Sequence, residues 1–305
     1  MHDRLSRATA QRTTQAFMFR DTRADPEVIV VAFRGTPPFD AQAWSTDFDI
    51  SWYELPDNVG KVHGGFMKAL GLQKVRGWPK EIQQGENHPV AYYTLREKLR
   101  EMLKMNEKAK FIVTGHSLGG ALAILFPLVL AMHEEHEMLK KMEGVYTYGQ
   151  PRVGDEKLGQ FMKQQLSLHG VPYVRCVYGN DMVPRLPYDD STLLFKHFGN
   201  CHYYNSLYEG NILEEEPNKN YFSLIMILPK ILNAVWELIR SLVIPYIKGP
   251  DYEEGWFMRT LQVAGIILPG LSAHAPVDYV NSTRLGSTIL ANELQNPTDS
   301  NHKFD

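Results

Sequence analysis

Apolar runs alternate with segments of helical periodicity along most of the first 180 residues. Four apolar runs have the length and the β-branched or aromatic content of buried strands: residues 28–33, 111–114, 145–148 and 173–178. Three intervening segments place apolar residues at helical spacing: 93–104, 118–136 and 157–168. Strands that alternate with helices build a mostly parallel sheet with helices on both faces. The pattern therefore predicts an α/β fold.

This alternation stops between about residues 203 and 270. The triplet Glu214-Glu215-Glu216 predicts a solvated loop, and the strongly apolar segment 222–247 follows it. Proline and charged residues interrupt that segment, so we expect no membrane-spanning helix. At 100° per residue its polar side chains fall within an arc of about 100°. They are Lys230, Asn233, Glu237, Arg240 and Ser241.

The apolar arc of segment 222–247 is wider than packing on one sheet face requires. A second apolar patch follows at 261–271. One interpretation is a helical insertion, about 205–270, folded onto the core or onto itself. Another is contact with a lipid surface, with Trp236 and the flanking Lys230, Arg240 and Lys248 near head groups. Packing of segment 222–247 against another chain, giving a homo-oligomer, is a third.

Composition narrows the function classes. The 305 residues, 44% hydrophobic and 22% charged, suit one domain, 1–305, with that insertion and with a disordered tail at 296–305. A net charge of −3 with no basic run predicts no nucleic-acid partner. Two cysteines cannot form a disulfide framework, which favours a reducing, intracellular compartment. The polar first residues predict no secretory signal. Cys176 lies in an apolar run, so we expect it to be a buried thiol on a strand.

The segment Gly115-His116-Ser117-Leu118-Gly119-Gly120 is the main candidate for chemistry. It follows an apolar run and opens a helical stretch, and strand, G-x-S-x-G, helix is the pattern of a nucleophile elbow. Such a turn exposes the serine hydroxyl, and bulky neighbours two residues away would collide with the strand and the helix. The backbone N–H of Leu118, at a helix N-terminus, would face a developing oxyanion. We therefore expect Ser117 to be a nucleophile.

A serine nucleophile needs an imidazole base and a carboxylate that orients it. Asp181 lies just after the strand 173–178 and so at the same sheet edge as Ser117; Asp189 and Asp190 are alternatives in a polar loop. His274 follows a Pro/Gly turn, and its C-terminal position fits the chain order Ser, acid, His.

The other histidines give rivals for the base. His202 is the main one, and His197 lies on the same aromatic-rich segment. We expect His63 and His116 to have structural roles. A second oxyanion donor should follow an early strand, where Thr36 is placed by Phe33-Arg34-Gly35-Thr36.

Together these motifs resemble the class 3 lipases, in the order that is typical of that family. The matching segments are Phe33-Arg34-Gly35-Thr36, Val62-His63-Gly64-Gly65-Phe66, Gly115 to Gly120, Tyr148-Gly149-Gln150-Pro151-Arg152-Val153-Gly154 and Gly179-Asn180-Asp181-Met182-Val183-Pro184. Two further stretches, 38–41 and 278–284, are most similar to the plant oil-body triacylglycerol lipases. One departure is the long gap from Asp181 to His274, 274 − 181 = 93 residues, because the apolar insertion falls within it.

The resemblance implies an α/β-hydrolase fold and a triad of Ser117, Asp181 and His274, with Thr36 and Leu118 as oxyanion donors. It places a lid at about 37–44, with Phe39 and Trp44 as apolar contacts. It implies a triacylglycerol lipase that needs no metal or organic cofactor and acts on acylglycerols at an oil-body, lipid-droplet or membrane surface. A phospholipase or galactolipase and a catalytically silent lipase-like scaffold are the alternatives.

Overall fold

A computed structural model describes residues 16–35, 51–56, 58–72, 90–189, 193–219, 221, 223, 227–249, 252, 255–267, 270 and 272–286. Its centre is a seven-stranded sheet in the order β1-β2-β5-β6-β7-β8-β9. The strands are β1 Ala16–Asp21, β2 Val28–Phe33, β5 Lys110–His116, β6 Met142–Tyr148, β7 Tyr173–Tyr178, β8 Asn200–Tyr204 and β9 Gly210–Leu213. The five strands from β2 to β8 are parallel, and the edge strands β1 and β9 are antiparallel. The predicted α/β class with a mostly parallel sheet is confirmed.

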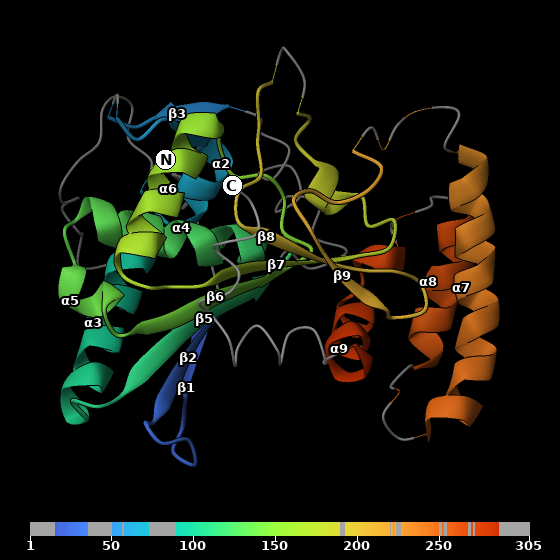
Figure 1. The fold of residues 1–305 in the computed structure, drawn as a ribbon, viewed down its shortest axis with the longest axis horizontal. Helices are drawn as coiled ribbons and strands as arrows, with labels where there is room; N and C mark the ends of the chain where they lie inside the picture. Colours follow the sequence, from blue (N-terminus) through green and yellow to red (C-terminus); the bar gives the residue numbers. More distant parts are fainter. Residues whose placement is uncertain are drawn as a thin grey trace, which may run out of the picture.

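The helices gather around this sheet (Figure 1). They are α2 Gly64–Ala69, α3 Ala91–Met105, α4 Leu118–Met132, α5 His136–Leu139, α6 Glu156–Leu168, α7 Ile227–Lys248, α8 Trp256–Ile267 and α9 Pro276–Leu285, with 3₁₀ turns η1 Val183–Arg185 and η4 Ser272–His274. A small second sheet pairs β3 Trp52–Glu54 with β4 Lys61–His63. Helix α4 packs against β2, β5 and β6 and is buried from Gly119 to Ala131. Helix α4 is apolar on every side because it is buried on every side.

Each of the four predicted strands and three predicted helices has its counterpart. Strands β1, β8 and β9 were not expected, because each is short and carries polar residues that shorten its apolar run. Strand β9 lies inside the range expected as a helical insertion and instead extends the sheet. The helices within that range are α7 and α8. The tail 296–305 lies outside the described residues.

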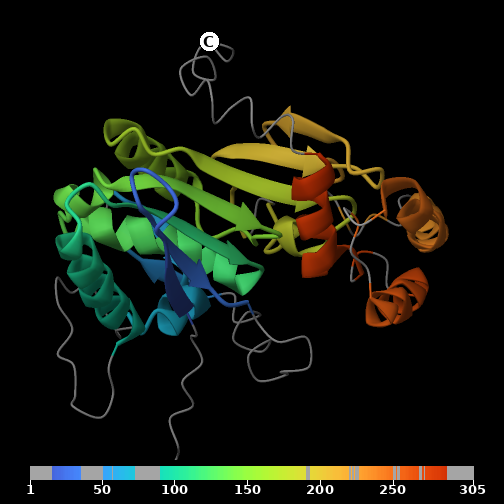
Figure 2. The ribbon, with the colours of Figure 1, turned by 90° about the horizontal axis from the view of Figure 1, so that it is seen from below.

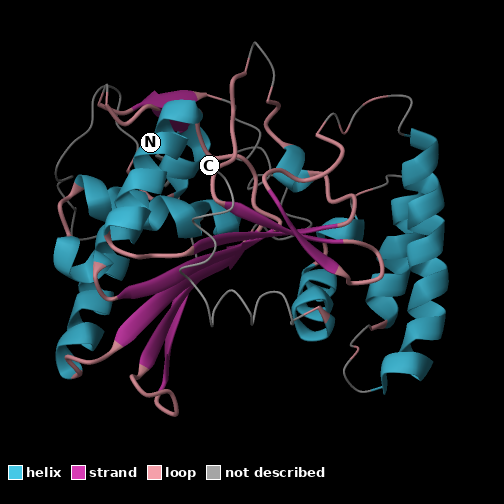
Figure 3. Cartoon of the chain, viewed as in Figure 1, coloured by secondary structure: helices cyan, strands magenta, loops and turns pink. Residues whose placement is uncertain are grey.

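Helices α7 and α8 stand side by side at the end of the molecule opposite α3 and α5 (Figures 1 and 3). Within the described part of the chain, no helix combines the length and apolarity needed to cross a bilayer. The two helices instead form a layer beside α9, as the view from below shows (Figure 2).

Helix α7 turns its polar side inward. Lys230, Glu237, Arg240 and Ser241 are at most 4% exposed, whereas every exposed side chain from 227 to 247 is apolar or aromatic. The expectation that Lys230 and Arg240 lie near lipid head groups is therefore wrong, because both are buried against the rest of the domain. The side chain of Lys248 lies outside what the structure describes.

Candidate active site

Strand β5 ends in a sharp turn that carries Ser117. The serine has φ 58°, and α4 begins at the next residue. A Cβ on Gly115 would lie 2.1 Å from the carbonyl oxygen of Gly119, and one on Gly119 would lie 2.2 Å from that of Phe33. Because these contacts are with backbone that cannot move aside, glycine is required at both positions. The strained turn places the Ser117 side chain at the carboxyl edge of the sheet.

Three side chains from distant segments meet at this edge. His274 Nε2 lies 2.8 Å from Ser117 Oγ, and His274 Nδ1 lies 2.8 Å from Asp181 Oδ2. Asp181 follows β7, and its Oδ1 accepts the Val183 N–H at 2.8 Å. Asp181 is 0% exposed and Ser117 4%. A hydroxyl, an imidazole and a buried carboxylate in this order can deprotonate the hydroxyl for attack on a carbonyl carbon.

Tyr279 on α9 joins this group and was not expected from the sequence. Its hydroxyl donates to Asp181 Oδ2 at 2.5 Å and accepts the Tyr178 N–H at 3.3 Å. Burial, and next the Asp181 carboxylate, raise the pKa of Tyr279 well above its ordinary value, so the hydroxyl stays a donor. The resemblance at 278–284 includes Tyr279 but gives it no role, because that role depends on how α9 packs against the end of β7.

The ring of His116 lies 4.6 Å from that of His274 and 5.4 Å from that of Tyr279. Burial and the neighbouring His274 hold the pKa of His116 well below its usual range, so this ring stays neutral. His116 therefore packs against the His274 ring as an uncharged neighbour.

The rival residues lie elsewhere. His202 is buried in β8, opposite Cys176 of β7. His197 Nε2 donates to the Pro184 carbonyl at 2.6 Å. Asp189 forms ion pairs with Lys196 and Lys219, and Asp190 lies outside the described residues. The structure thus brings Asp181 and His274, and none of the described rivals, into contact with the Ser117 group.

The proposed oxyanion donors are described only in part. Leu118 is the first residue of α4, and an N–H at that position has no acceptor within its own helix. A Cβ on Gly35 would lie 2.6 Å from the His116 carbonyl oxygen and 3.2 Å from Ser117 Cβ. The chain therefore passes against the elbow just before Thr36. Thr36, Phe39 and Trp44 lie outside the described residues, and their roles stay predictions.

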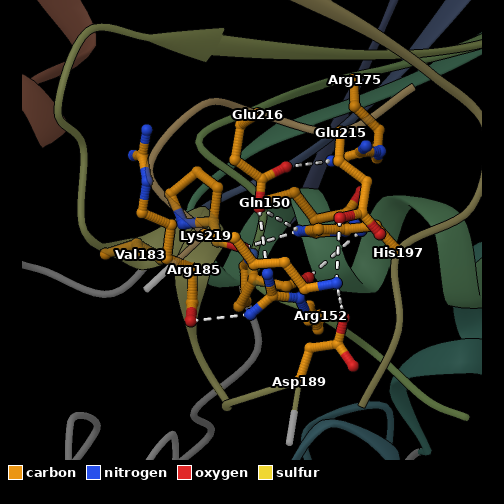
Figure 4. Close-up of polar contacts among 12 residues, drawn as sticks. Gln150, Arg152, Arg175, Val183, Arg185, Asp189, His197, Glu215, Glu216 and Lys219 are labelled. Atoms are coloured by element: carbon orange, nitrogen blue, oxygen red, sulfur yellow. Dashed lines mark hydrogen bonds and ion pairs between the residues drawn. The ribbon is translucent and has the colours of Figure 1, made fainter. Parts of the chain in front are cut away.

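A buried ion cluster supports the turn that carries Asp181 (Figure 4). Glu216 lies 3.1 Å from Arg152 Nη2 and 3.4 Å from Arg175 Nη1. Arg185 of η1 donates to the carbonyls of Gly179, Asp181 and Pro217. Glu216 is 3% exposed, so the expectation of a solvated Glu214–Glu216 loop is wrong for this residue. The segment around Glu216 instead ties η1 to the core.

Metal-dependent chemistry has no candidate centre within the described ranges, where no group of three or more His, Cys, Asp or Glu side chains could hold an ion.

The family model described as "Lipase (class 3)" matches residues 30–191. The chain is 47% identical to a "Triacylglycerol lipase OBL1" of Nicotiana tabacum and 48% identical to that of Arabidopsis thaliana. These matches cover 90% and 93% of this chain and 58% of each relative. The chain thus spans less than two thirds of the length of these relatives.

Among solved structures, the native Rhizomucor miehei lipase propeptide complex is similar with a TM-score of 0.52 and 28% identity, over 67% of this chain and 57% of the other. It supports the α/β-hydrolase fold.

Proposed function

This chain belongs to the class 3 lipase family, and from that membership we propose that it is a triacylglycerol lipase. The observation that carries the proposal is the unbroken line of hydrogen bonds from Ser117 through His274 to Asp181. The choice of acylglycerols as substrate rests on the plant relatives, which are named triacylglycerol lipases.

The reaction follows from this geometry. His274 Nε2 accepts the Ser117 proton while Oγ attacks the ester carbonyl carbon, and the tetrahedral intermediate places its oxyanion toward the Leu118 N–H. His274 then gives the proton to the leaving alcohol, and an acyl-enzyme remains. Water, deprotonated by the same imidazole, attacks this ester and releases the fatty acid. Asp181 holds the ring in the tautomer that these transfers need and stabilises the imidazolium.

We also propose that the outward face of α7 and α8 binds the surface of a neutral-lipid body. The large exposed apolar side chains of these two helices, which we call the apolar plate, are Ile227, Leu228, Leu232, Trp236, Ile239, Leu242, Val243, Tyr246, Ile247, Trp256, Val263 and Ile267. Helix α7 turns its charged residues toward the protein and apolar residues outward, an arrangement that suits contact with an apolar surface. Attachment to a lipid droplet, with the enzyme reaching its substrate from that surface, is the location this proposal favours.

Flotation with triolein droplets tests the apolar plate. Changing Leu232 and Ile239 together to serine removes two apolar anchors, each worth about 1.5–3 kcal/mol when fully buried, so partitioning should fall more than tenfold. Leu168→Ser, at a 70% exposed apolar position on α6, is the matched control and should float like wild type. Equal flotation of all three proteins would refute the proposal. Self-association in sedimentation without lipid, lost in the double variant, would reassign the plate to a second copy of this chain.

Fatty-acid release tests the activity. Wild type and Ser117→Ala are compared on emulsified triolein, phosphatidylcholine vesicles and a soluble short-chain ester. Preferential release from triolein that disappears in Ser117→Ala supports the proposal. Release from phosphatidylcholine alone would favour a phospholipase, and no release by folded wild type would favour a lipase-like scaffold.

A further inference from the structure

Arg240 on the inner side of α7 contacts three other elements at once. Its Nη1 donates to the Tyr178 hydroxyl at 2.6 Å and to the carbonyl of Ser206, and its Nη2 lies 3.1 Å from Asp278 Oδ1. The guanidinium also lies over the Tyr208 ring, 4.4 Å from its centroid. Arg240 is 3% exposed. It therefore links α7 to the end of β7, to the segment after β8 and to the start of α9.

Two of these contacts flank the acid of the candidate triad. Tyr178 is the last residue of β7, three residues before Asp181, and its N–H donates to the Tyr279 hydroxyl. Asp278 directly precedes Tyr279 on α9. The Arg240 guanidinium thus fixes the two backbone segments between which Tyr279 donates to Asp181. His274 bonds the same carboxylate oxygen, so a shift of α9 would change the geometry of the base as well.

We propose that Arg240 is a positioning residue for the hydrolysis, acting through Tyr279 on the Asp181–His274 pair. This inference rests on the proposed function and deepens it. An arginine suits the task because its planar group donates in several fixed directions at once, whereas a lysine ammonium at the same place keeps the charge without that geometry. The helix that carries the apolar plate on its outer side thus holds the acid and base from its inner side.

The test uses the full chain and a soluble short-chain ester, so that lipid binding does not enter the rate. Arg240→Lys should lower kcat by up to about tenfold, and no more than Tyr279→Phe does, because small displacements of catalytic groups lower the rate and Arg240 acts through the Tyr279 hydroxyl. KM should stay within about twofold, since Arg240 is buried and its described contacts are with groups of the protein. Arg96→Lys is the matched control: Arg96 on α3 also pairs with a carboxylate and lies over tyrosine rings, remote from the triad.

A double-mutant cycle separates positioning from general stability. If Arg240 acts through Tyr279, Arg240→Lys should cost less than about twofold in a Tyr279→Phe background. If the fold-losses in kcat of the two single variants multiply in the double variant, the proposal is overturned. An unchanged kcat in folded Arg240→Lys would overturn it as well.

Should Arg240→Lys not fold, Asp278→Asn removes the ion pair without changing side-chain shape and carries the same cycle. Inactive wild type would refute the proposed function itself, whereas active wild type with an equally active Arg240→Lys refutes only the positioning role.

Discussion

Glu237 should make the fold less stable as the pH rises, and Glu237→Gln should remove this effect. The carboxyl group is 3% exposed on the inner side of α7. It accepts hydrogen bonds from Asn233 Nδ2 at 2.9 Å and from the Tyr178 hydroxyl at 3.3 Å. Burial, and next the nearby Asp278 carboxylate, raise the pKa of Glu237 from 4.5 to about 7.

The raised pKa fixes the sign and the size of the effect. Below pH 4.5 Glu237 is protonated in both the folded and the unfolded chain, so its titration takes nothing from the free energy of unfolding. Between pH 4.5 and about 7 only the unfolded chain releases the proton, and unfolding becomes progressively easier. At about 1.4 kcal/mol per pKa unit, this interval corresponds to a loss of roughly 3 kcal/mol above pH 7. A glutamine side chain carries no such penalty at any pH.

Urea unfolding at about pH 4.5 and about pH 8.5 measures the difference. The free energy of unfolding of Glu237→Gln minus that of wild type should be larger by roughly 3 kcal/mol at the higher pH. Comparing the two pH values cancels any effect of the amide on packing, since packing does not titrate. The same difference at both pH values would show that the Glu237 carboxyl is not held protonated, and the reasoning would fail.

Three other substitutions have expected outcomes. Tyr279→Phe removes the donor to Asp181, so kcat on a soluble ester should fall about tenfold with KM unchanged, which steady-state kinetics checks. Glu216→Gln leaves two buried arginines without their carboxylate, and the free energy of unfolding should fall by about 3–5 kcal/mol in urea titrations. Gly115→Ala places a Cβ 2.1 Å from the Gly119 carbonyl oxygen; thermal unfolding should show a large loss of stability, and a wild-type melting temperature would contradict the elbow geometry.

The sequence predicts best where its signals are contiguous. Strand β5, the elbow and α4 follow one another directly, so apolar run, glycines and helical spacing all point to one structure. Asp181 could be predicted as the acid for a similar reason. It comes just after a strand that runs parallel to its neighbours, so it lies at the same sheet edge as Ser117. The prediction of His274 rests on the Pro/Gly turn before it and on chain order, and only the packing of η4 and α9 brings it to the serine.

What the pattern leaves open depends on long-range packing. The sequence periodicity predicts the polar and apolar arcs of α7, but it does not show which arc faces the protein. Usually the apolar side is buried; here Glu237 and Arg240 find buried partners on β7 and α9, and the polar side faces inward. The burial of Glu216 is equally hard to predict from the sequence, because its arginine partners are far away in the chain, at positions 152 and 175.

The identity of the nucleophile is tested most directly by the mass of the intact protein after reaction with an alkyl phosphonate ester. The arrangement of Ser117, His274 and Asp181 predicts one covalent adduct per chain, formed on Ser117 and absent from folded Ser117→Ala. Wild type that is folded and stays unlabelled, or an adduct on another residue, would contradict this assignment of the nucleophile.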